Sequence, residues 1–358
     1  MADKTQIPHN QPTLGLDEEK AAAEVIRSGW IAQGSRVAEF ESNFAGYASL
    51  PETNAVALSS GTSALYVALK LLDLPTDSEI IIPTYVCSAL LNAIHMAGCL
   101  PVLVDVNETD FNLTVDGVKA AITDKTGAII VVHMFGYPAD TVGLTKLGLP
   151  VIEDCATALG SSSDGKAVGL TSDIGIFSFY PSKMIATGQG GMLVSKNKDI
   201  TDRARDYREF DGREDYYPRF NFHLTDLQAA VGIVQLKRLP DFLKARNQIG
   251  ETYRAICEEK GWDYQRVRSD SCHLNFYRFV IKGEMTLIEK IKADLIAENI
   301  ETIIPVEKWE LLHNYLKLDA TPFPIAERLS AGTLSLPIYP RVADNKILSR
   351  ISRVLRAV

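Results

Sequence analysis

A single lysine, Lys183, lies between two apolar runs, in the stretch SFYPSKMIATGQGG that extends from 178 to 191. The run before it, 174–180, and the run after it, 191–195, both read as buried strands. A lysine in such a place either extends its ammonium group to solvent or takes part in chemistry. The spacing therefore makes Lys183 the first residue to test for a chemical role.

A carboxylate, Asp154, ends another apolar run in the sequence VIEDCATALG, where we expect the carboxyl end of a buried strand. A buried carboxylate is costly unless a cation or hydrogen bonds compensate for the lost water. One interpretation makes Asp154 the N-cap of a following helix. The other places its strand beside the strand that leads to Lys183, so that the acid and the lysine meet at one edge of the sheet.

Small residues in the stretch SSGTSALYVALKLL follow the first predicted strand and open a helix at about Thr62. Gly61 lets the backbone turn tightly, and the free N–H groups at Thr62 and Ser63 would form an anion site at the helix N-terminus. The same residues also suit plain N-capping by Ser60 or Thr62. The G-x-G-x-x-G pattern of dinucleotide binding is absent from this stretch.

These three features together match the needs of pyridoxal 5′-phosphate. This cofactor requires a lysine for a Schiff base, an acid beside its pyridinium nitrogen and an anion site for its phosphate. Lys183, Asp154 and the turn at Gly61 supply one group each. The combination is much more specific than any of its parts, so we expect pyridoxal 5′-phosphate as the cofactor.

A second glycine-rich stretch, GSSSDGKA at 160–167, nearly matches the phosphate-binding P-loop pattern. Its last position is Ala167, which lacks the hydroxyl group that binds Mg²⁺ in P-loop proteins. No long apolar helix follows it either. We therefore predict a polar hairpin turn with a solvated Lys166, and we exclude a P-loop kinase.

The elements that must position these residues alternate between short β-branched runs and segments with helical spacing. This alternation is typical of a mostly parallel sheet covered by helices on both faces, which binds ligands at the carboxyl ends of its strands. The predicted strands are 55–60, 79–83, 101–106, 128–134, 150–155, 174–180 and 191–195.

The character of the chain changes after about residue 200. A charged and aromatic loop, 206–223, leads into an apolar-periodic helix that Pro240 follows. Beyond it the chain reads as a smaller α/β unit, with FYRFVIKG as one strand candidate. We therefore predict a large domain over 1–240 and a small domain over 241–358.

Composition excludes several classes of protein. The net charge of −8 argues against a protein whose main partner is nucleic acid. Five scattered cysteines without a C-x-x-C pair fit neither a disulfide framework nor a zinc site, so we expect no metal and a cytoplasmic protein. We expect no signal peptide and no membrane association, because the N-terminus is polar and no apolar run is long enough to span a bilayer.

The chain resembles the sugar aminotransferases of the DegT/DnrJ/EryC1/StrS family over essentially its whole length. The resemblance implies the type I fold of pyridoxal-phosphate enzymes, an α/β fold. Its large domain has a mostly parallel seven-stranded sheet flanked by helices, and a smaller C-terminal α/β domain follows. The segments that carry the resemblance are GWIAQGSRVAEFESNFAGY, AVALSSGTSAL, VHMFGYPAD, VIEDCATALGS, FSFYPSKMIATGQGGML, RFNFHLTDLQAAVGIVQL and FPIAERLSAGTLSLPIYP.

The resemblance also implies a role for each matching residue. Lys183 matches the family's Schiff-base lysine, Asp154 its pyridinium partner and Ser178 a phosphate ligand. The backbone at Gly61, Thr62 and Ser63 matches the phosphate-binding turn. Asn221 matches an asparagine that family members lend to the phosphate of the neighbouring subunit, which implies a homodimer with shared active sites.

Three departures from the family pattern affect the site. Cys87 stands where the family places an aromatic residue over the cofactor ring, and Tyr85 would share its face on a strand-like spacing. Thr157 replaces a glutamine or histidine but still has a hydroxyl group for the phenolic oxygen of the ring. Glu307 stands about where a substrate-side histidine is common, with His313 farther on, and neither takes over that role.

Other polar residues keep two interpretations each. His133 would pack beneath the cofactor or contact substrate, and His223 stands where arginine is common, which fits a role at the subunit interface. Arginines and tyrosines of the loop would meet a nucleotide diphosphate across that interface or remain solvated. These loop residues are Arg213, Tyr216, Tyr217 and Arg219.

The sequence thus predicts a cytoplasmic, homodimeric aminotransferase dependent on pyridoxal phosphate. It would move an amino group, with glutamate as donor, to the keto group of a nucleotide-linked sugar. The reaction would be ping-pong, with Lys183 linked to the cofactor and pyridoxamine phosphate as the amine carrier. Two alternatives stay open: a cofactor-binding regulatory homologue without turnover, and an aminotransferase for a non-nucleotide keto or cyclitol acceptor.

Overall fold

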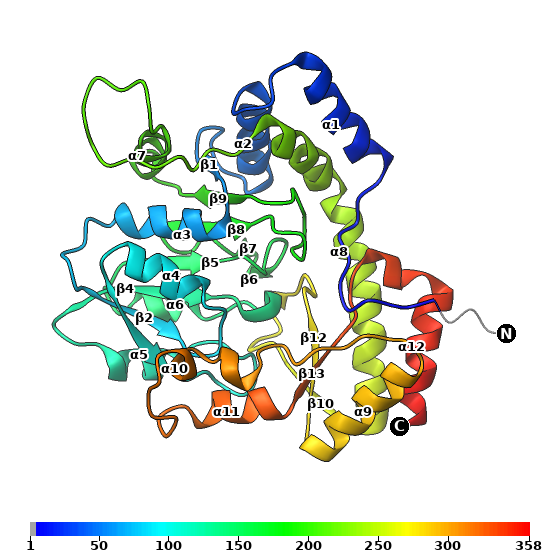
Figure 1. Cartoon of the computed structure of the whole chain (residues 1–358). Coiled ribbons are helices and arrows are strands. Elements are labelled where there is room, and N and C mark those ends of the chain that lie inside the picture. Colours follow the sequence, from blue (N-terminus) through cyan, green and yellow to red (C-terminus); the bar gives the residue numbers. More distant parts are fainter. Residues whose placement is uncertain (1–4) are drawn as a thin grey trace.

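The computed structural model of the chain describes residues 5–358 (Figure 1). Its centre is a seven-stranded sheet with the strand order β1-β9-β8-β5-β4-β2-β3. Only β9 runs antiparallel to its neighbours β1 and β8, so the sheet is mostly parallel, as predicted. The strands are β1 (Ala55–Leu58), β2 (Glu79–Pro83), β3 (Leu100–Val104), β4 (Thr126–Val132), β5 (Val151–Asp154), β8 (Ile174–Ser178) and β9 (Gly191–Val194).

The two faces of this sheet receive alternate residues of each strand, because side chains of a strand point to opposite sides in turn. On β5, Ile152 packs into the core beneath α3 and α4, whereas Val151 packs against α5 and α6. The helices of this part are α1 (Leu16–Ser28), α2 (Ser35–Tyr47), α3 (Gly61–Lys70), α4 (Ala89–Met96), α5 (Val115–Ala121), η1 (Met134–Gly136), α6 (Thr141–Thr145) and α7 (Lys198–Arg208). With both faces covered, strands β1, β5 and β9 are buried along their whole length.

One long helix, α8 (Asp226–Lys260), connects the sheet to the C-terminal part of the chain (Figure 1). The sequence predicts a break at Pro240, but α8 passes through this residue without one. Proline in a helix costs about 3 kcal/mol. Burial of Leu239 and Phe242 in one core and of Tyr253 in the next offsets that cost. The predicted domain boundary at residue 240 therefore lies inside a continuous helix, and it stays a prediction.

The C-terminal part is a smaller α/β layer with its own core. Its antiparallel sheet has the order β10-β12-β13, and Ile7 near the N-terminus joins the same core through a bridge to Ile300. Its strands are β10 (Asp263–Tyr264), β12 (Phe279–Lys282) and β13 (Thr333–Leu336). Its helices are α9 (Met285–Ala297), η2 (Lys308–Glu310), α10 (Leu312–Tyr315), α11 (Pro324–Ala331), η3 (Pro340–Ala343) and α12 (Asn345–Ala357).

The stretch that mimics a P-loop is a hairpin, as predicted. Strands β6 (Ser162–Ser163) and β7 (Lys166–Ala167) pair with each other, and β11 (Cys272–His273) extends them to three strands. Lys166 is exposed. All five cysteines are free thiols, in agreement with the absence of a disulfide pattern. Among residues 5–358, no helix has both the length and the apolar character that a membrane span requires.

Candidate active site

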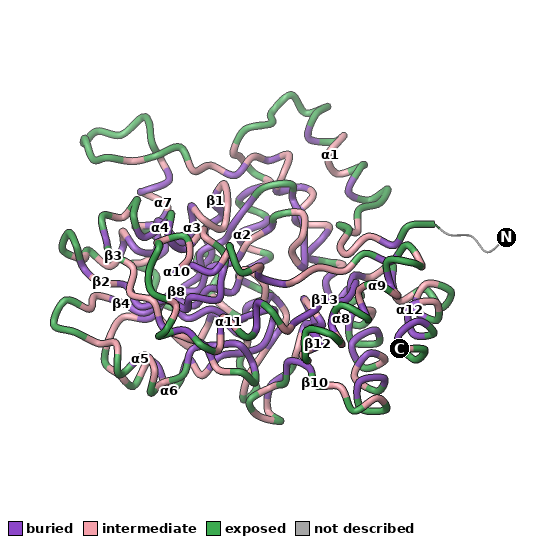
Figure 2. Tube along the Cα trace, turned by 60° about the horizontal axis from the view of Figure 1, so that its bottom comes forward, coloured by how far each residue is buried: buried purple, intermediate pink, exposed green. Residues whose placement is uncertain are grey.

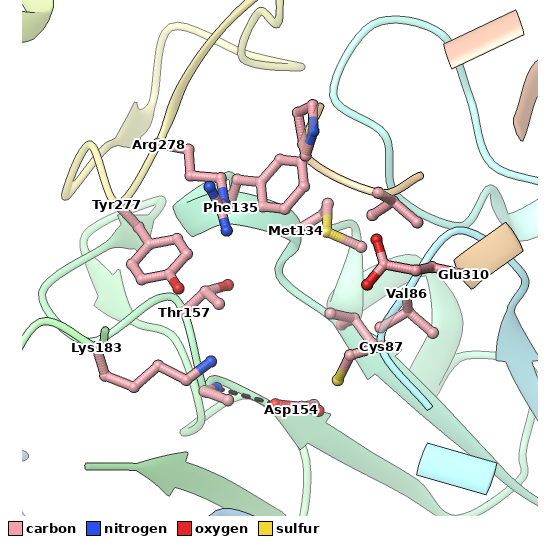
Figure 3. Close-up of a pocket in the computed structure, with 14 residues that line it drawn as sticks. Val86, Cys87, Met134, Phe135, Asp154, Thr157, Lys183, Tyr277, Arg278 and Glu310 are labelled. Atoms are coloured by element: carbon pink, nitrogen blue, oxygen red, sulfur yellow. Dashed lines mark hydrogen bonds between the residues drawn. The ribbon is translucent and has the colours of Figure 1, made fainter. Parts of the chain in front are cut away.

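A cavity opens where the carboxyl ends of the parallel strands face the segment before β12 and the η2 region (Figure 3). Parallel sheets bind ligands at this edge. The wall combines apolar side chains with a few polar ones that point inward. Its lining residues are Val86, Cys87, Val132, Met134, Phe135, Asp154, Ala156, Thr157, Lys183, Tyr277, Arg278, Pro305, Val306 and Glu310.

Asp154 forms the floor of this cavity as the last residue of β5. It is buried, and its Oδ1 accepts the N–H of Ala156 at 2.9 Å, which closes a turn. No helix begins here, because turn residues follow Asp154, so the N-cap interpretation is wrong. Burial raises the pKa of Asp154, against the opposing effects of the Ala156 hydrogen bond and the charge of Lys183.

Lys183 extends into the same cavity from the turn after β8. Its N–H donates to the carbonyl of Tyr180 at 2.8 Å, and its Nζ lies 5.5 Å from the centre of the Tyr277 ring. Figure 3 shows its ammonium group directed toward the end of β5 where Asp154 lies. Lys183 therefore does not extend to open solvent, and the acid and lysine are brought together as predicted.

The turn at Gly61 begins α3 beside the end of β8. A methyl group on Gly61 would lie 2.8 Å from Cβ of Ser178, so these two residues are in close contact. The first intrahelical bond runs from Ala64 to the carbonyl of Ser60. The N–H groups of Gly61 and Thr62 therefore precede the bonded part of the helix and point to its open end.

Ser63 differs from its two predecessors, because its polar groups already have partners. Its N–H donates to Oγ of Ser60 at 3.0 Å, and its hydroxyl donates to the Ser60 carbonyl at 2.8 Å. This is the N-cap that the sequence offered as an alternative, with Ser60 as the cap. The cap and an anion site at Gly61 and Thr62 are compatible, since they use different N–H groups.

Cys87 and Thr157 line the cavity on two sides of Asp154. The Cys87 thiol faces the cavity, and the surrounding protein atoms remove water from it and so raise its pKa. The hydroxyl of Thr157 donates to the backbone carbonyl of His133 at 3.0 Å. Tyr85 does not share the face of Cys87: it is fully buried and packs edge-on against Phe111.

Asn221 lies outside the cavity of its own chain. It is exposed, and its Oδ1 accepts the N–H of His223 at 3.4 Å. The adjoining Phe222 carbonyl accepts the N–H of Ser59 at 2.8 Å, which holds this segment beside the end of β1. A single chain thus brings Cys87, Asp154, Thr157 and Lys183 into one cavity, places Gly61, Thr62 and Ser178 at the same sheet edge, and leaves Asn221 at the surface.

The sequence model of the DegT/DnrJ/EryC1/StrS aminotransferase family matches residues 12–356 of this chain. The chain belongs to this family. It is 31% identical over 354 residues to GDP-perosamine synthase of Vibrio cholerae, with 95% of this chain and 96% of that protein covered. It is 34% identical over 314 residues to the UDP-N-acetyl-3-dehydro-alpha-D-glucosamine 3-aminotransferase of Acidithiobacillus ferrooxidans, with 84% and 83% covered.

The fold comparison agrees with the sequence comparison. The solved aminotransferase TlmJ from Streptoalloteichus hindustanus superposes with a TM-score of 0.91 at 29% identity, and 98% of each chain is covered. The type I fold and the enzyme class predicted from the sequence are thereby confirmed: the chain is an aminotransferase.

Three polar residues of the aminotransferase's cavity escaped the sequence analysis, namely Tyr277, Arg278 and Glu310. Tyr277 and Arg278 immediately precede β12, in a stretch that the sequence marks only as a strand. Burial acts to raise the pKa of Tyr277, but the charges of Lys183 and Arg278 and a hydrogen bond to Ser182 outweigh it and lower the pKa to about 8. The only sign of these two residues in the sequence was that polar side chains stand at the start of a predicted strand.

Glu310, rather than Glu307, reaches the cavity from the η2 region. The Glu307 backbone N–H donates to Oε2 of Glu310 at 2.8 Å, so Glu307 serves as the cap of this short helix. His313 is buried behind it, between Oγ1 of Thr84 at 2.7 Å and Oε1 of Glu327 at 3.0 Å. Neither Glu307 nor His313 lines the cavity.

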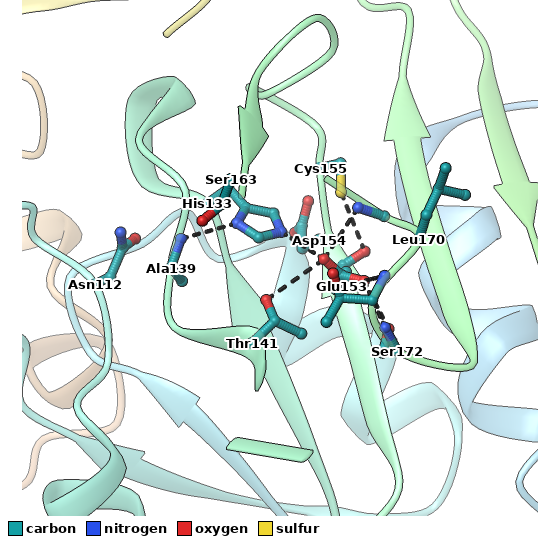
Figure 4. A network of polar contacts seen from close by, with 12 residues as sticks. Asn112, His133, Ala139, Thr141, Glu153, Asp154, Cys155, Ser163, Leu170 and Ser172 are labelled. Atoms are coloured by element: carbon teal, nitrogen blue, oxygen red, sulfur yellow. Dashed lines mark hydrogen bonds and ion pairs between the residues drawn. The ribbon is translucent and has the colours of Figure 1, made fainter. Parts of the chain in front are cut away.

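His133 does not line the cavity and instead joins the polar network around Glu153 (Figure 4). Its Nδ1 accepts the N–H of Ala139 at 3.0 Å and its Nε2 lies 3.0 Å from Oε2 of Glu153. Both expectations for this side chain, packing beneath the cofactor and substrate contact, are therefore wrong. Strand alternation explains the result, because Val132 faces the cavity and the next residue faces away.

The two arginines of the loop after α7 form ion pairs with an acid at the end of that helix. Arg213 and Arg219 both pair with Asp206, Arg219 at 2.9 Å, and Tyr216 is 95% exposed. His223 lies 3.3 Å from Oε2 of Glu209. Within one chain, residues 210–218 are exposed, the Arg219 side chain is only 5% exposed, and the loop contributes no residue to the cavity.

Proposed function

We propose that this aminotransferase uses pyridoxal 5′-phosphate to move an amino group from glutamate to the keto group of a nucleotide-linked sugar. The observation that carries the proposal is the meeting of Lys183 and buried Asp154 in one cavity at the carboxyl edge of the sheet. The names of the relatives support the acceptor class, since both act on sugars carried by a nucleotide, one named for GDP and the other for UDP.

The residues present suit this cofactor. Asp154 Oδ1 is held by Ala156, and its other carboxylate oxygen makes no hydrogen bond within residues 5–358. A buried carboxylate of this kind needs a cation or a donor, and the protonated ring nitrogen is both. The open N–H groups at Gly61 and Thr62, next to the Ser178 hydroxyl, would hold the phosphate.

Asp154 and Lys183 divide the work between them. When bound, the cofactor supplies an electron sink for charge that develops at the carbon beside the transferred nitrogen. Asp154 would keep a proton on the ring nitrogen, because the negative charge of its buried carboxylate, through the free oxygen, stabilises a cation at that position. Lys183 Nζ, on a flexible stem, carries the proton to and from the reacting carbon.

Cys87 and Thr157 would line the two sides of the ring, and the thiol provides less stacking area than an aromatic side chain. Thr157 Oγ1 donates its proton to the His133 carbonyl, so toward the cavity this hydroxyl can only accept a hydrogen bond. We infer that ring binding depends more on Asp154 and the phosphate turn than on stacking.

We also propose a homodimer in which Asn221 completes the phosphate site of the partner subunit. Asn221 is exposed beside the start of α3 and reaches no site in its own chain. Large apolar side chains are exposed between α1 and α2 and in the loop that precedes Asn221, and exposed apolar patches mark protein interfaces. They are Trp30, Ile31, Phe210, Tyr217 and Phe220.

Absorbance spectroscopy tests the proposed function. The purified protein, supplied with pyridoxal phosphate, should show a visible band that bleaches when glutamate is added. Borohydride reduction followed by mass spectrometry should place the cofactor on Lys183. The Lys183→Ala variant should lose steady-state transamination by about 100- to 10,000-fold, because proton transfer depends on this side chain.

Each outcome has a separate meaning. A band that glutamate leaves unchanged would favour another donor or the regulatory homologue without turnover. Full turnover by Lys183→Ala would contradict the proposal outright. A panel of keto-sugars with and without a nucleotide then decides between the two acceptor classes.

A further inference from the structure

Arg278 immediately precedes β12, and its side chain extends into the cavity opposite the end of β5 (Figure 3). Its guanidinium carbon lies 5.3 Å from the centre of the Phe135 ring and 5.5 Å from that of Tyr277. Two aromatic rings thus hold the planar group in place, which is a contact that arginine makes better than lysine.

This guanidinium group has no anionic partner among residues 5–358. Its Nε is buried without a hydrogen bond, and its Nη1 makes only long contacts, 3.4 Å to Nε2 of His9 and 3.5 Å to Oγ of Ser335. His9 is no counter-ion, because a histidine ring carries no negative charge, and burial and the charges of Arg278 and Arg246 lower its pKa to about 3 and keep it neutral. A half-buried cation without a counter-ion requires an explanation.

A second arginine behind the wall strengthens the positive field. Arg246 on α8 is buried and donates through Nη1 to the carbonyls of Phe276, Tyr277 and Ile338, at 3.0, 3.2 and 2.6 Å. These bonds fix the backbone that leads to Arg278. Within residues 5–358, no carboxylate pairs with Arg246.

Acidic groups of the cavity lie elsewhere. Glu310 belongs to the η2 region and accepts the N–H of Glu307, and Asp154 lies on the floor. Figure 3 shows Glu310 across the cavity from Arg278, and no ion pair joins them. The open space between the arginine and Lys183 is therefore suited to an oxyanion.

The geometry points to a substrate carboxylate as that anion. We propose that Arg278 binds the carboxylate of the molecule that exchanges its amino group at Lys183, an inference that rests on the proposed function. Lys183 Nζ and the Arg278 guanidinium carbon each lie 5.5 Å from the centre of the Tyr277 ring, and both groups line the cavity. A carboxylate on the reacting carbon is one bond from the atom that Lys183 serves, whereas the phosphates of a nucleotide-sugar lie beyond the sugar ring.

Two substrates could bring that carboxylate. One is the amino-acid donor, which carries it on the carbon that bears the amine. The other is an acceptor sugar that is itself an acid. Arg278 recognises the same planar group in both, and bidentate pairing of guanidinium with carboxylate provides the selectivity.

Variants Arg278→Gln and Arg278→Lys test the assignment. The first half-reaction is followed as bleaching of the visible band at increasing glutamate. Loss of one charged, hydrogen-bonded pair should raise the half-saturating concentration about 10- to 100-fold, with a smaller change in the limiting rate. With 4-aminobutyrate, which lacks the carboxylate at the amine carbon, variant and wild type should agree within about 2-fold.

Calorimetry with glutarate provides a reading that does not depend on turnover. The holoprotein should bind this unreactive dicarboxylate, and Arg278→Gln should weaken binding about 10- to 100-fold, with partial recovery in Arg278→Lys. Arg353→Gln is the matched control, because this arginine lies on α12 with its side chain 71% exposed. Circular dichroism checks that each variant is folded.

The arms of the experiment separate the possible outcomes. Weaker binding of glutamate in the Arg278 variants, with unchanged binding of a neutral amino-sugar, would assign Arg278 to the carboxylate of the donor. An effect confined to acidic sugars would assign it to the carboxylate of the acceptor. Equal glutarate and glutamate binding in Arg278→Gln and wild type would overturn the proposal. If glutamate bleaches no band in the wild type, the proposed function fails, and the glutarate titration still decides the role of Arg278.

Discussion

Glu153 and Asp154 are neighbours in the chain with opposite surroundings, because consecutive residues of β5 face opposite sides of the sheet. Asp154 faces the cavity, and burial raises its pKa. Glu153 accepts three backbone N–H groups, two hydroxyls and the ring of His133 (Figure 4). Burial would raise its pKa too, but these partners, His133 foremost, lower it to about 2.

Glu153 is therefore a structural anion that holds the strand ends in register, and a neutral replacement should destabilise the fold. In Glu153→Gln an amide NH₂ would face N–H donors, and we expect a loss of about 3 kcal/mol in the free energy of unfolding at pH 7. The folded pKa lies below the ordinary value, so this stability is present above about pH 4.5 and is lost as the pH falls toward 2.

Urea unfolding at pH 7 and at pH 3 measures both effects. The difference between wild type and Glu153→Gln should shrink at the lower pH. Glu289→Gln serves as the control, because Glu289 is exposed on α9 and should change stability by no more than about 0.5 kcal/mol at either pH. A difference that is independent of pH would contradict the ionised state of Glu153.

At the scale of elements, the sequence predicts the sheet well and the entry to β12 poorly. All seven central strands were predicted, because strands buried on both faces are continuous apolar runs. Lys183 and Asp154 followed from their positions at strand ends. Tyr277 and Arg278 did not, because only packing of the C-terminal layer against the sheet turns them toward Lys183. Pro240 misled for a similar reason: burial along α8 outweighs its local preference.

The start of α3 allows a prediction about the phosphate turn. A methyl group on Gly61 would meet Cβ of Ser178 at 2.8 Å, so Gly61→Ala must push α3 and the end of β8 apart. We expect pyridoxal phosphate to bind about 10-fold more weakly or worse, as measured by fluorescence titration, from a displacement equivalent to about 1.4 kcal/mol or more. Gly46→Ala on α2 is the control, since its added methyl group meets nothing within 4 Å. Equal weakening in both variants would show a general loss of stability instead.

At the scale of the whole molecule, the chain ends and the exposed faces were beyond sequence reasoning. Ile7 pairs with Ile300 and belongs to the C-terminal core, a contact between distant parts of the chain that no local pattern encodes. Residues 210–218 are exposed throughout, on the side of α1 and α7 (Figure 2). Phe210 and Tyr217 in that loop are exposed within one chain, and exposed apolar side chains of this kind mark surfaces that bind another protein.

Subunit mixing tests whether a second copy is that surface. Lys183→Ala and Asn221→Ala should each be impaired alone, the first in proton transfer and the second in cofactor binding. If Asn221 acts on the partner subunit, a mixed dimer contains one site with both native residues. Random exchange should then restore about one quarter of wild-type activity, since half of the dimers are mixed and each has one intact site. If Asn221 served its own chain, no mixed dimer would hold an intact site, and mixing would restore nothing. Sedimentation of each variant confirms that the dimer itself persists.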